Sequence, residues 1–306
     1  MPRTLVTIAC LTSLLGTVLR AQEPKPTTAK PSQNLEPTYA NLSYGPHARN
    51  VMDVWLTKSA KPQPVLVSIH GGGFEKGEKT IDRDLLKRCL DAKIAVVAIN
   101  YRLSQDAIAP AAFLDSARAI QFVRQHAQEW NLDPKRVAAT GPSAGAGISL
   151  WLGFHSDLAD PKNTDPVLRE STRLTCLAIL DGQCSYDPRF IKQLIPENDT
   201  YKSRFLAAFF GVKLDSLDNL PAEKYRLFEE ASPINFLTKD APPVLQLYGY
   251  SLNSPITDQT IGIHHPRFGK VLKDKMDALG VPCELTSKQA SGQTIFVFIK
   301  KHFGMN

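Results

Sequence analysis

Short hydrophobic segments alternate with longer amphipathic segments along most of the chain. Residues 65–69 and 94–99 are rich in β-branched side chains and are flanked by polar residues, which is typical of strands buried on both faces of a sheet. Residues 109–129 instead repeat hydrophobic side chains every three or four positions, which indicates an amphipathic helix. This alternation predicts an α/β fold with a doubly wound, mostly parallel sheet, because helices then connect successive parallel strands.

The same patterns predict the positions of the other elements. Residues 38–44 and 50–57 lie on either side of Gly45-Pro46 and predict an N-terminal antiparallel hairpin. We expect further strands at residues 136–140, 174–180, 243–248 and 282–287, and helices at residues 85–91, 144–154 and 270–279.

Two segments leave their structure open. Residues 186–237 interrupt the alternation and are rich in aromatic side chains, which suits a small cap inserted over the sheet edge or an ordinary pair of packing helices. Residues 295–303 carry β-branched side chains typical of a strand. Their terminal position favours a helix instead, with Ile295, Ile299 and Phe303 facing the core.

The N-terminus predicts an export signal. Arg3 precedes hydrophobic or small residues, and Ala21 offers a site for cleavage. We therefore predict a signal peptide at residues 1–21 and a secreted or periplasmic protein. Residues 22–37 contain prolines among polar side chains, which is typical of a linker. Residues 38–306 then suit one α/β domain, with no later hydrophobic segment long enough to span a membrane.

Charge and cysteine content add few constraints. The formal net charge is +6, but acidic and basic residues are interspersed, so we interpret the charge as a solvated surface and expect no nucleic-acid partner. Beyond the signal, Cys89, Cys176, Cys184 and Cys283 are widely spaced, unlike the ligands of a zinc site. They are compatible with buried thiols or with disulfides. We expect no metal and no cofactor.

A serine motif is the strongest chemical signal. Gly141-Pro142-Ser143-Ala144-Gly145 fits the pattern G-x-S-x-G between a predicted strand and a predicted helix. In that context the serine lies on a strained turn, so that its Oγ projects from the sheet and can act as a nucleophile. The glycines leave room for backbone that side chains would block. The following helix points the positive end of its dipole toward the same place, which stabilises an oxyanion.

Three glycines follow His70, directly after the strand predicted at residues 65–69. A chain without Cβ atoms can approach a substrate carbonyl and present its amides to it. We expect Gly71 and Gly72, with the amide of Ala144, to form an oxyanion hole. His70 is then expected to brace the loop rather than to act as a base. By itself, such a loop is also compatible with phosphate binding or with a plain tight turn.

From about residue 38 onward, the chain resembles the hormone-sensitive-lipase and feruloyl-esterase-like branch of the α/β hydrolases. The resemblance implies the α/β-hydrolase fold and carboxylesterase activity, with Ser143 as the nucleophile. It leaves Arg102 and Asp115 as a buried structural pair. The matching residues are Asp53-Val54, His70-Gly71-Gly72-Gly73, Asn100-Tyr101-Arg102, Pro110, Asp115, the segment from Asn131 to Val137, and Ser143-Ala144-Gly145.

The carboxylate that completes such a site is not at the family's usual position. The resemblance puts it after the strand predicted at residues 243–248, in a segment similar to H-G-x-x-D, but residues 248–253 contain no carboxylate. Asp258 is the next one along the chain. Asp181 and Asp187, which follow the preceding strand, are the alternatives, because some hydrolases of this fold carry their acid there.

The histidine is displaced as well. The family carries it after the last strand, but residues 287–294 contain none, and we expect His302, further on, to pack or to face solvent. His264 and His265 remain, in a loop after a predicted parallel strand. Such loops share one edge of a parallel sheet, so that a base there can reach Ser143. The histidine pair is equally compatible with a structural role at the start of a helix.

These observations predict a secreted serine hydrolase that acts on carboxylic esters. Ser143 attacks the acyl carbon, His264 or His265 carries the proton, and Asp258 or Asp181 orients the histidine. We expect a small-molecule or polysaccharide-linked ester as the substrate, the polysaccharide by analogy only. One alternative is a catalytically degenerate fold that serves as a binding module. A further alternative is a peptidase or acyltransferase that uses the same site.

Overall fold

The computed structural model describes residues 35–287 and 291–305. The predicted signal peptide lies outside this part of the chain, and so does the predicted linker up to Asn34. Within the described residues, no helix is both long enough and apolar enough to cross a membrane.

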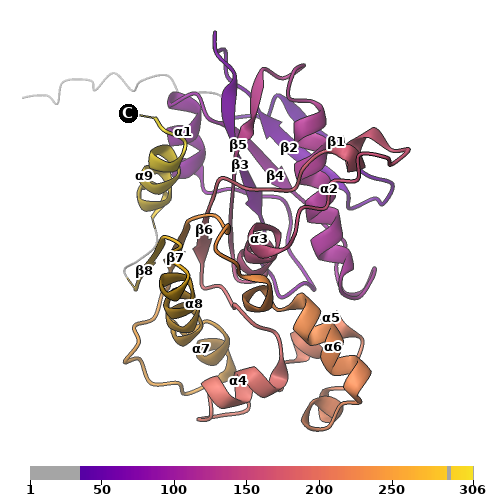
Figure 1. The fold of residues 1–306 in the computed structure, drawn as a ribbon, viewed down its shortest axis with the longest axis vertical. Helices are drawn as coiled ribbons and strands as arrows, with labels where there is room; N and C mark the ends of the chain where they lie inside the picture. The colour runs from indigo at the N-terminus through magenta and orange to yellow at the C-terminus, as the bar shows by residue number, and fades with distance from the viewer. Residues whose placement is uncertain (1–34, 288–290, 306) are drawn as a thin grey trace, which may run out of the picture. The chain divides into compact units, whose positions relative to one another are not determined.

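A twisted eight-stranded sheet is built from the described residues between Tyr39 and Thr286, with the strand order β1-β2-β4-β3-β5-β6-β7-β8 (Figure 1). Strand β2 pairs antiparallel with β1 and with β4, and the remaining neighbouring pairs are parallel. The predicted mostly parallel sheet with an N-terminal antiparallel hairpin is confirmed. The strands are β1 (Tyr39–Ser43), β2 (Val51–Trp55), β3 (Gln63–Ile69), β4 (Ala95–Ile99), β5 (Leu132–Pro142), β6 (Cys176–Leu180), β7 (Val244–Leu247) and β8 (Cys283–Thr286).

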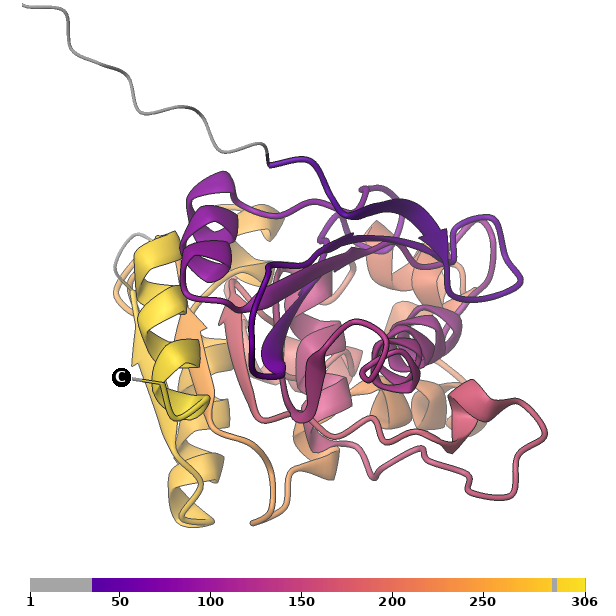
Figure 2. The same ribbon diagram turned by 90° about the horizontal axis from the view of Figure 1, so that it is seen from above.

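Helices cover both faces of this sheet (Figure 2). Successive strand side chains point to opposite faces, and β3 shows the result: Leu66 packs in one hydrophobic cluster, whereas Val65 and Val67 pack in the other. The first cluster is covered by α1 (Arg83–Asp91) and α9 (Gly292–His302), and the second by α2 (Ala111–Gln125), α3 (Ala144–Phe154) and α8 (Arg267–Ala278).

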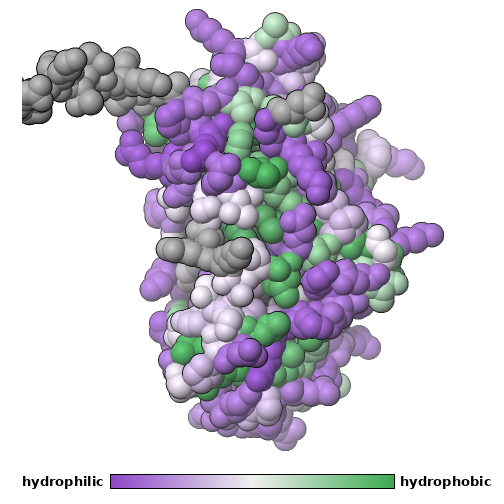
Figure 3. Space-filling view, turned by 90° about the vertical axis from the view of Figure 1, so that its left-hand side faces the viewer, coloured by the Kyte–Doolittle hydropathy of each residue, from purple (hydrophilic) through white to green (hydrophobic). Residues whose placement is uncertain are grey.

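The ambiguous C-terminal segment is a helix. Within α9, Ile295, Phe298 and Ile299 are buried, a spacing of three and four residues that aligns one helical face with the core. Burial of that face outweighs the weak preference of β-branched side chains for a strand. On the side of the molecule that carries α8, β8 and α9, hydrophilic side chains surround a narrow hydrophobic stripe (Figure 3).

The segment between β6 and β7 contains short helices and an aromatic core. It includes α4 (Pro188–Leu194), α5 (Arg204–Phe210), α6 (Ala222–Ala231) and the 3₁₀ turns Leu214–Asp218 and Pro233–Phe236. Phe209 of α5 stacks on Phe74, with ring centroids 3.7 Å apart. Because Phe74 directly follows the triple-glycine sequence, this contact ties the predicted cap segment to the loop after β3.

The four cysteines of the described chain are free and buried. Of the two alternatives that the sequence leaves open for Cys89, Cys176, Cys184 and Cys283, buried thiols are therefore the correct one. Burial raises the pKa of the Cys89 thiol to about 12, which makes the reactive thiolate scarce at neutral pH. Burial likewise raises the pKa of Cys176 and Cys184 to about 12 and that of Cys283 to about 11.

Candidate active site

Ser143 lies on a sharp turn between β5 and α3. Its backbone has φ 50° and ψ −114°, a conformation that a residue with a Cβ rarely adopts and that marks stored strain. The flanking glycines are required by a close approach to β3. A Cβ atom on Gly141 would lie 2.2 Å from the carbonyl oxygen of Ile69, and one on Gly145 would lie 2.0 Å from the same oxygen. The G-x-S-x-G sequence therefore lets α3 begin directly against the end of β3.

The triple-glycine loop runs alongside this turn. Strands β3 and β5 are parallel neighbours, and a Cβ atom on Gly71 would lie 2.7 Å from the carbonyl oxygen of Pro142. Within the described part of the chain, the amides of Gly71 and Gly72 donate no hydrogen bond. The amide of Ala144 precedes the first helical bond of α3, which runs from Gly147 to the carbonyl of Ser143. These three amides thus have no hydrogen-bond acceptor among the described residues.

His264 supplies the imidazole that Ser143 contacts. Its Nε2 atom lies 3.0 Å from the Oγ atom of Ser143, within the range expected for a base that takes the serine proton. His264 is at the C-terminal end of a short helix, α7 (Gln259–Ile263). A Cβ atom on Gly262 would lie 1.9 Å from Thr200 Oγ1, so α7 packs tightly on the segment between β6 and β7. That packing sets the direction of the His264 side chain.

The electrostatic environment of His264 favours the neutral imidazole. Burial lowers the pKa of His264 below its ordinary value of 6.5, while the negative charge of Asp181 and a hydrogen bond to the backbone of Thr260 act in the opposite direction. Since a neutral imidazole is the form that accepts a proton, His264 is ready to act as a base at neutral pH.

Asp181 lies at the end of β6, next to the end of β7. Its amide donates to the carbonyl of Leu247, and its Oδ1 accepts a 2.8 Å hydrogen bond from the Gly249 amide. With φ 50°, its backbone turns sharply away from the strand. Asp181 acts on His264 through its charge, which raises the pKa of the imidazole and so favours its protonated form.

The other predicted candidates lie elsewhere. His265 is fully buried, and its ring nitrogens lie 3.2 Å from the carbonyl of Ser254 and 3.3 Å from the amide of Arg267. The carbonyl can only accept and the amide can only donate, so both ring nitrogens already form hydrogen bonds to the backbone. Asp258 caps α7 by accepting from the Ile261 amide. The structure therefore brings His264, rather than His265, to Ser143, and it uses Asp258 as a helix cap.

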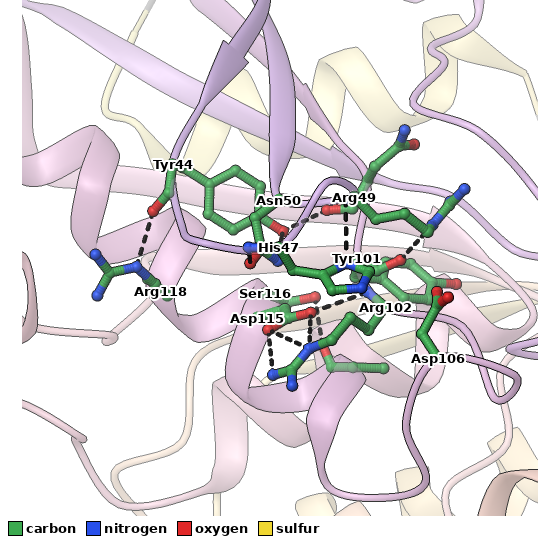
Figure 4. Close-up of polar contacts among 12 residues, drawn as sticks. Tyr44, His47, Arg49, Asn50, Tyr101, Arg102, Asp106, Asp115, Ser116 and Arg118 are labelled. Atoms are coloured by element: carbon green, nitrogen blue, oxygen red, sulfur yellow. Dashed lines mark hydrogen bonds and ion pairs between the residues drawn. The ribbon is translucent and has the colours of Figure 1, made fainter.

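Asp187 and His302 also have structural positions. Asp187 caps α4 and forms a double hydrogen bond with Arg189, and His302 packs on Phe298 within α9. Arg102 and Asp115 form the predicted structural pair, with Asp115 buried and bonded to the Arg102 guanidinium and amide (Figure 4).

One contact near the glycines could not be predicted from the amino-acid sequence. The ring of Phe205, in α5, would lie 2.6 Å from a Cβ atom on Gly73, so the ring packs closely against the loop. The neighbouring Arg204 forms a 3.7 Å ion pair with Glu75. No motif marks either residue, because the contact depends on how the segment between β6 and β7 folds back. Among the residues the structure describes, no cluster of His, Cys, Asp and Glu could hold a metal ion.

Comparison with known proteins identifies relatives of this chain. A family model described as BD-FAE matches residues 52–262. Esterase LipQ of Mycobacterium tuberculosis (strain ATCC 25618 / H37Rv) is 28% identical over 215 residues, which are 69% of this chain and 48% of LipQ. The chain spans about half the length of the curated relatives it matches.

Solved structures share the fold at low sequence identity. An acetyl ester-xyloside bifunctional hydrolase from Caldicellulosiruptor lactoaceticus has a TM-score of 0.63 and 20% identity, covering 84% of this chain and 89% of its own. A truncated carbohydrate esterase from gut microbiota has a TM-score of 0.65 and 19% identity, covering 89% of this chain and 98% of its own. Together with the strand order, these likenesses establish the α/β-hydrolase fold.

Proposed function

Because the chain belongs to the BD-FAE family of α/β hydrolases, we propose that it hydrolyses carboxylic esters through an acyl-enzyme on Ser143. The observation that carries this proposal is the 3.0 Å approach of His264 Nε2 to Ser143 Oγ. A serine without a nearby base is a poor nucleophile at its free pKa. This contact supplies the base, although residues 287–294, where the family usually carries its histidine, contain none.

Acylation begins when His264 removes the Ser143 proton and Oγ bonds to the acyl carbon of the ester. The carbonyl electrons move onto oxygen, and the free amides of Gly71, Gly72 and Ala144 stabilise that charge. The charge of Asp181 favours the transient imidazolium of His264. The imidazolium then gives its proton to the departing alkoxide, which leaves as an alcohol while the acyl group stays on Ser143.

Deacylation repeats the same steps with water as the nucleophile. His264 removes a proton from water, the resulting hydroxide adds to the acyl carbon, and the same amides again hold the oxyanion. When the intermediate collapses, Ser143 leaves and recovers its proton from His264, releasing the carboxylic acid. Every proton that moves is carried by one imidazole, so no metal or cofactor is needed for this cycle.

An active ester hydrolase fits the geometry better than a degenerate binding module. A fold that had lost catalysis would have no reason to keep a strained Ser143 turn, an imidazole at hydrogen-bonding distance and unpaired amides beside them. A peptidase or an acyltransferase would use the same three features, and the two differ from an esterase in leaving group or in acceptor. Substrate profiling distinguishes them.

We propose acylated polysaccharides of plant or algal cell walls as the substrate class, on two grounds. Structural neighbours include proteins described as a carbohydrate esterase and an acetyl ester-xyloside hydrolase, and the predicted signal peptide directs the chain out of the cell. The secretion proposal is tested by sequencing the N-terminus of protein recovered from culture medium or periplasm. A chain that remains inside the cell and still begins at Met1 contradicts it.

The activity is tested on purified protein with p-nitrophenyl esters of increasing acyl length, with acetylated xylan, and with p-nitroanilide amides. We expect turnover of the esters, release of acetate from the polysaccharide, and covalent labelling by a fluorophosphonate probe. Turnover of esters without acetate release from xylan would refute only the substrate class. If no ester is turned over and no labelling occurs, the hydrolase proposal is wrong and the binding-module alternative is favoured.

Asp181→Asn is expected to lower kcat by about 10²- to 10⁴-fold and to move the acid limb of kcat/KM to lower pH. Asparagine can still accept from the Gly249 amide, so the backbone is held, but the charge is lost. That charge raises the pKa of His264, so without it the pKa falls, His264 stays neutral to lower pH, and it becomes a weaker base. Rate profiles between pH 4 and 9 measure both effects.

Asp258→Asn is the matched control for this substitution. Asp258 caps α7, the helix that carries His264, and asparagine is also a good capping residue. We expect kcat and the acid limb of this variant to stay near those of the wild type. Two results would contradict the assignment of Asp181. One is a loss of activity in Asp258→Asn as large as that in Asp181→Asn, and the other is an acid limb of kcat/KM that moves to higher pH in Asp181→Asn.

A further inference from the structure

The peptide between Gly71 and Gly72 is held from one side by His70. The Nδ1 atom of His70 lies 2.7 Å from the carbonyl oxygen of Gly71. On the same side, a Cβ atom on Gly77 would lie 2.6 Å from that oxygen and 2.4 Å from His70 Nδ1. Gly77 has φ 114°, so only a residue without a Cβ fits there. The far end of the loop thus closes over the Gly71 carbonyl.

Arg49 contacts the opposite side of the His70 ring. This residue comes from the turn between β1 and β2, and its Nη2 atom lies 3.4 Å from His70 Nε2. The same guanidinium donates to the carbonyl of Tyr101 at 2.8 Å and to the carbonyl of Gly77 at 2.9 Å. Arg49 and Tyr101 lie side by side in Figure 4, joined by the first of these bonds. One side chain therefore links the hairpin, the end of β4 and the glycine loop.

These two partners determine the tautomer of His70. The Gly71 carbonyl can only accept, so Nδ1 carries the proton, and the Arg49 guanidinium can only donate, so Nε2 must be a free acceptor. Tyr101 also holds the His70 position, because its ring stacks on the imidazole at 4.2 Å and its hydroxyl donates to the His70 backbone carbonyl. Burial lowers the pKa of His70 to about 4, with Arg49 acting in the same direction and Glu78 opposing it.

A peptide unit is planar and trans, so its carbonyl and its N–H point in opposite directions. If His70 holds the Gly71 carbonyl toward Gly77, the N–H of Gly72 must point to the other side. That amide is one of the three unpaired donors that the proposed mechanism assigns to the oxyanion. We propose that Arg49 is a positioning residue: by fixing the His70 tautomer it keeps the Gly71–Gly72 peptide in the orientation that the oxyanion hole requires.

The proposal rests on the hydrolase mechanism above but adds a residue that does not touch the substrate. Without the guanidinium, His70 can place its proton on Nε2, and Nδ1 then repels the carbonyl it previously bound. The peptide is free to turn, which carries the Gly72 amide away from the oxyanion. The predicted loss falls on transition-state stabilisation and leaves ground-state binding of the ester unchanged.

Arg49→Met is expected to lower kcat for p-nitrophenyl acetate by about 10²-fold, the loss typical of one oxyanion donor, with KM little changed. The Ki of an arylboronic acid, whose adduct with serine places an oxygen in the oxyanion position, should rise by a similar factor. Inhibition by the carboxylate product, which forms no tetrahedral adduct, should stay the same. Arg49→Lys keeps the charge but cannot reach all three acceptors at once, so it should recover part of the rate.

Arg118→Met is the matched control. The Nε atom of Arg118 also donates to a backbone carbonyl at 2.8 Å, and its side chain is 22% exposed, against 20% for Arg49. Both variants remove a half-buried guanidinium, but Arg118 contacts Tyr44 and Asp165 and not the loop. We expect Arg118→Met to lower the melting temperature about as much as Arg49→Met while keeping the wild-type kcat and boronate Ki.

The possible results distinguish failure of the Arg49 proposal from failure of the hydrolase proposal. If the wild type turns over esters and Arg49→Met matches Arg118→Met in kcat and in boronate affinity, the role of Arg49 is wrong and the hydrolase stands. If the wild type neither turns over esters nor takes the fluorophosphonate probe, both proposals are wrong. Should Arg49→Met not fold, the ring-nitrogen NMR shifts of His70 in the wild type carry the test: a proton on Nε2 rather than on Nδ1 would overturn the proposal.

Discussion

Ser143→Ala is expected to lower kcat for p-nitrophenyl acetate by about 10⁶-fold, the loss typical of removing the serine of such a site. The variant cannot form an acyl-enzyme, so hydrolysis would require water to attack the bound ester directly. The free amides remain, and a residual acceleration of about 10³- to 10⁴-fold over the uncatalysed reaction is expected from them and from binding. Stopped assays at high enzyme concentration measure this residual rate.

Ser149→Ala is the control for this substitution. Ser149 lies on the same helix, α3, and its buried hydroxyl donates to the carbonyl of Gly145. It therefore tests whether loss of any serine hydroxyl from this helix disturbs the turn. We expect Ser149→Ala to keep kcat within a small factor of the wild type and to label with a fluorophosphonate, whereas Ser143→Ala should not label. Retained labelling of Ser143→Ala would show that another residue is the nucleophile.

His264→Gln has the second-largest expected effect, a loss of kcat of about 10⁴- to 10⁶-fold. Glutamine fills a similar volume but cannot take the Ser143 proton, so the hydroxyl stays a weak nucleophile. The smaller variant His264→Ala leaves a space next to Ser143, and added imidazole is expected to restore part of its activity. Restoration that rises with pH through the pKa of free imidazole would identify the neutral base as the missing component.

The adjacent histidine makes this test specific. His265→Gln removes two buried hydrogen bonds, to Ser254 and Arg267, so it should lower the free energy of unfolding by about 1–3 kcal/mol. The activity of the folded fraction should remain near that of the wild type. The two variants thus have opposite effects: His264→Gln loses activity but stays stable, whereas His265→Gln loses stability but stays active. A His265→Gln protein that is stable but inactive would reverse the assignment.

The proposed acid, Asp181, and the proposed base, His264, each lie one strand earlier than in the family that the sequence resembles. That resemblance places the carboxylate after the strand that is β7 here and the histidine after the last strand. In this chain His264 follows β7 and Asp181 follows β6. Because β5, β6 and β7 are adjacent and parallel, both residues still reach the edge where Ser143 lies. As in that family, the proposed acid follows one strand and the proposed base follows the next, but each is one strand earlier in this chain.

The amino-acid sequence alone determined the sheet, the turn at Ser143 and the glycine loop. These features leave local patterns in the chain: hydrophobic periodicity selects strand or helix, and the glycines at 141 and 145 let a helix begin directly against the end of β3. It could not select between His264 and His265 or between Asp181 and Asp258, since each pair shares residue type and the same sheet edge.

Only the tertiary structure made those choices. Consecutive residues at the end of a helix point about 100° apart, so only one histidine of the pair can face Ser143, and the rotation of α7 decides which one. That rotation is set by the packing of Gly262 on Thr200, a contact between segments far apart in the chain. Arg49 reaches His70 for the same reason: the pairing of β2 with β4 brings a hairpin turn to the glycine loop. Such contacts leave no local pattern in the sequence.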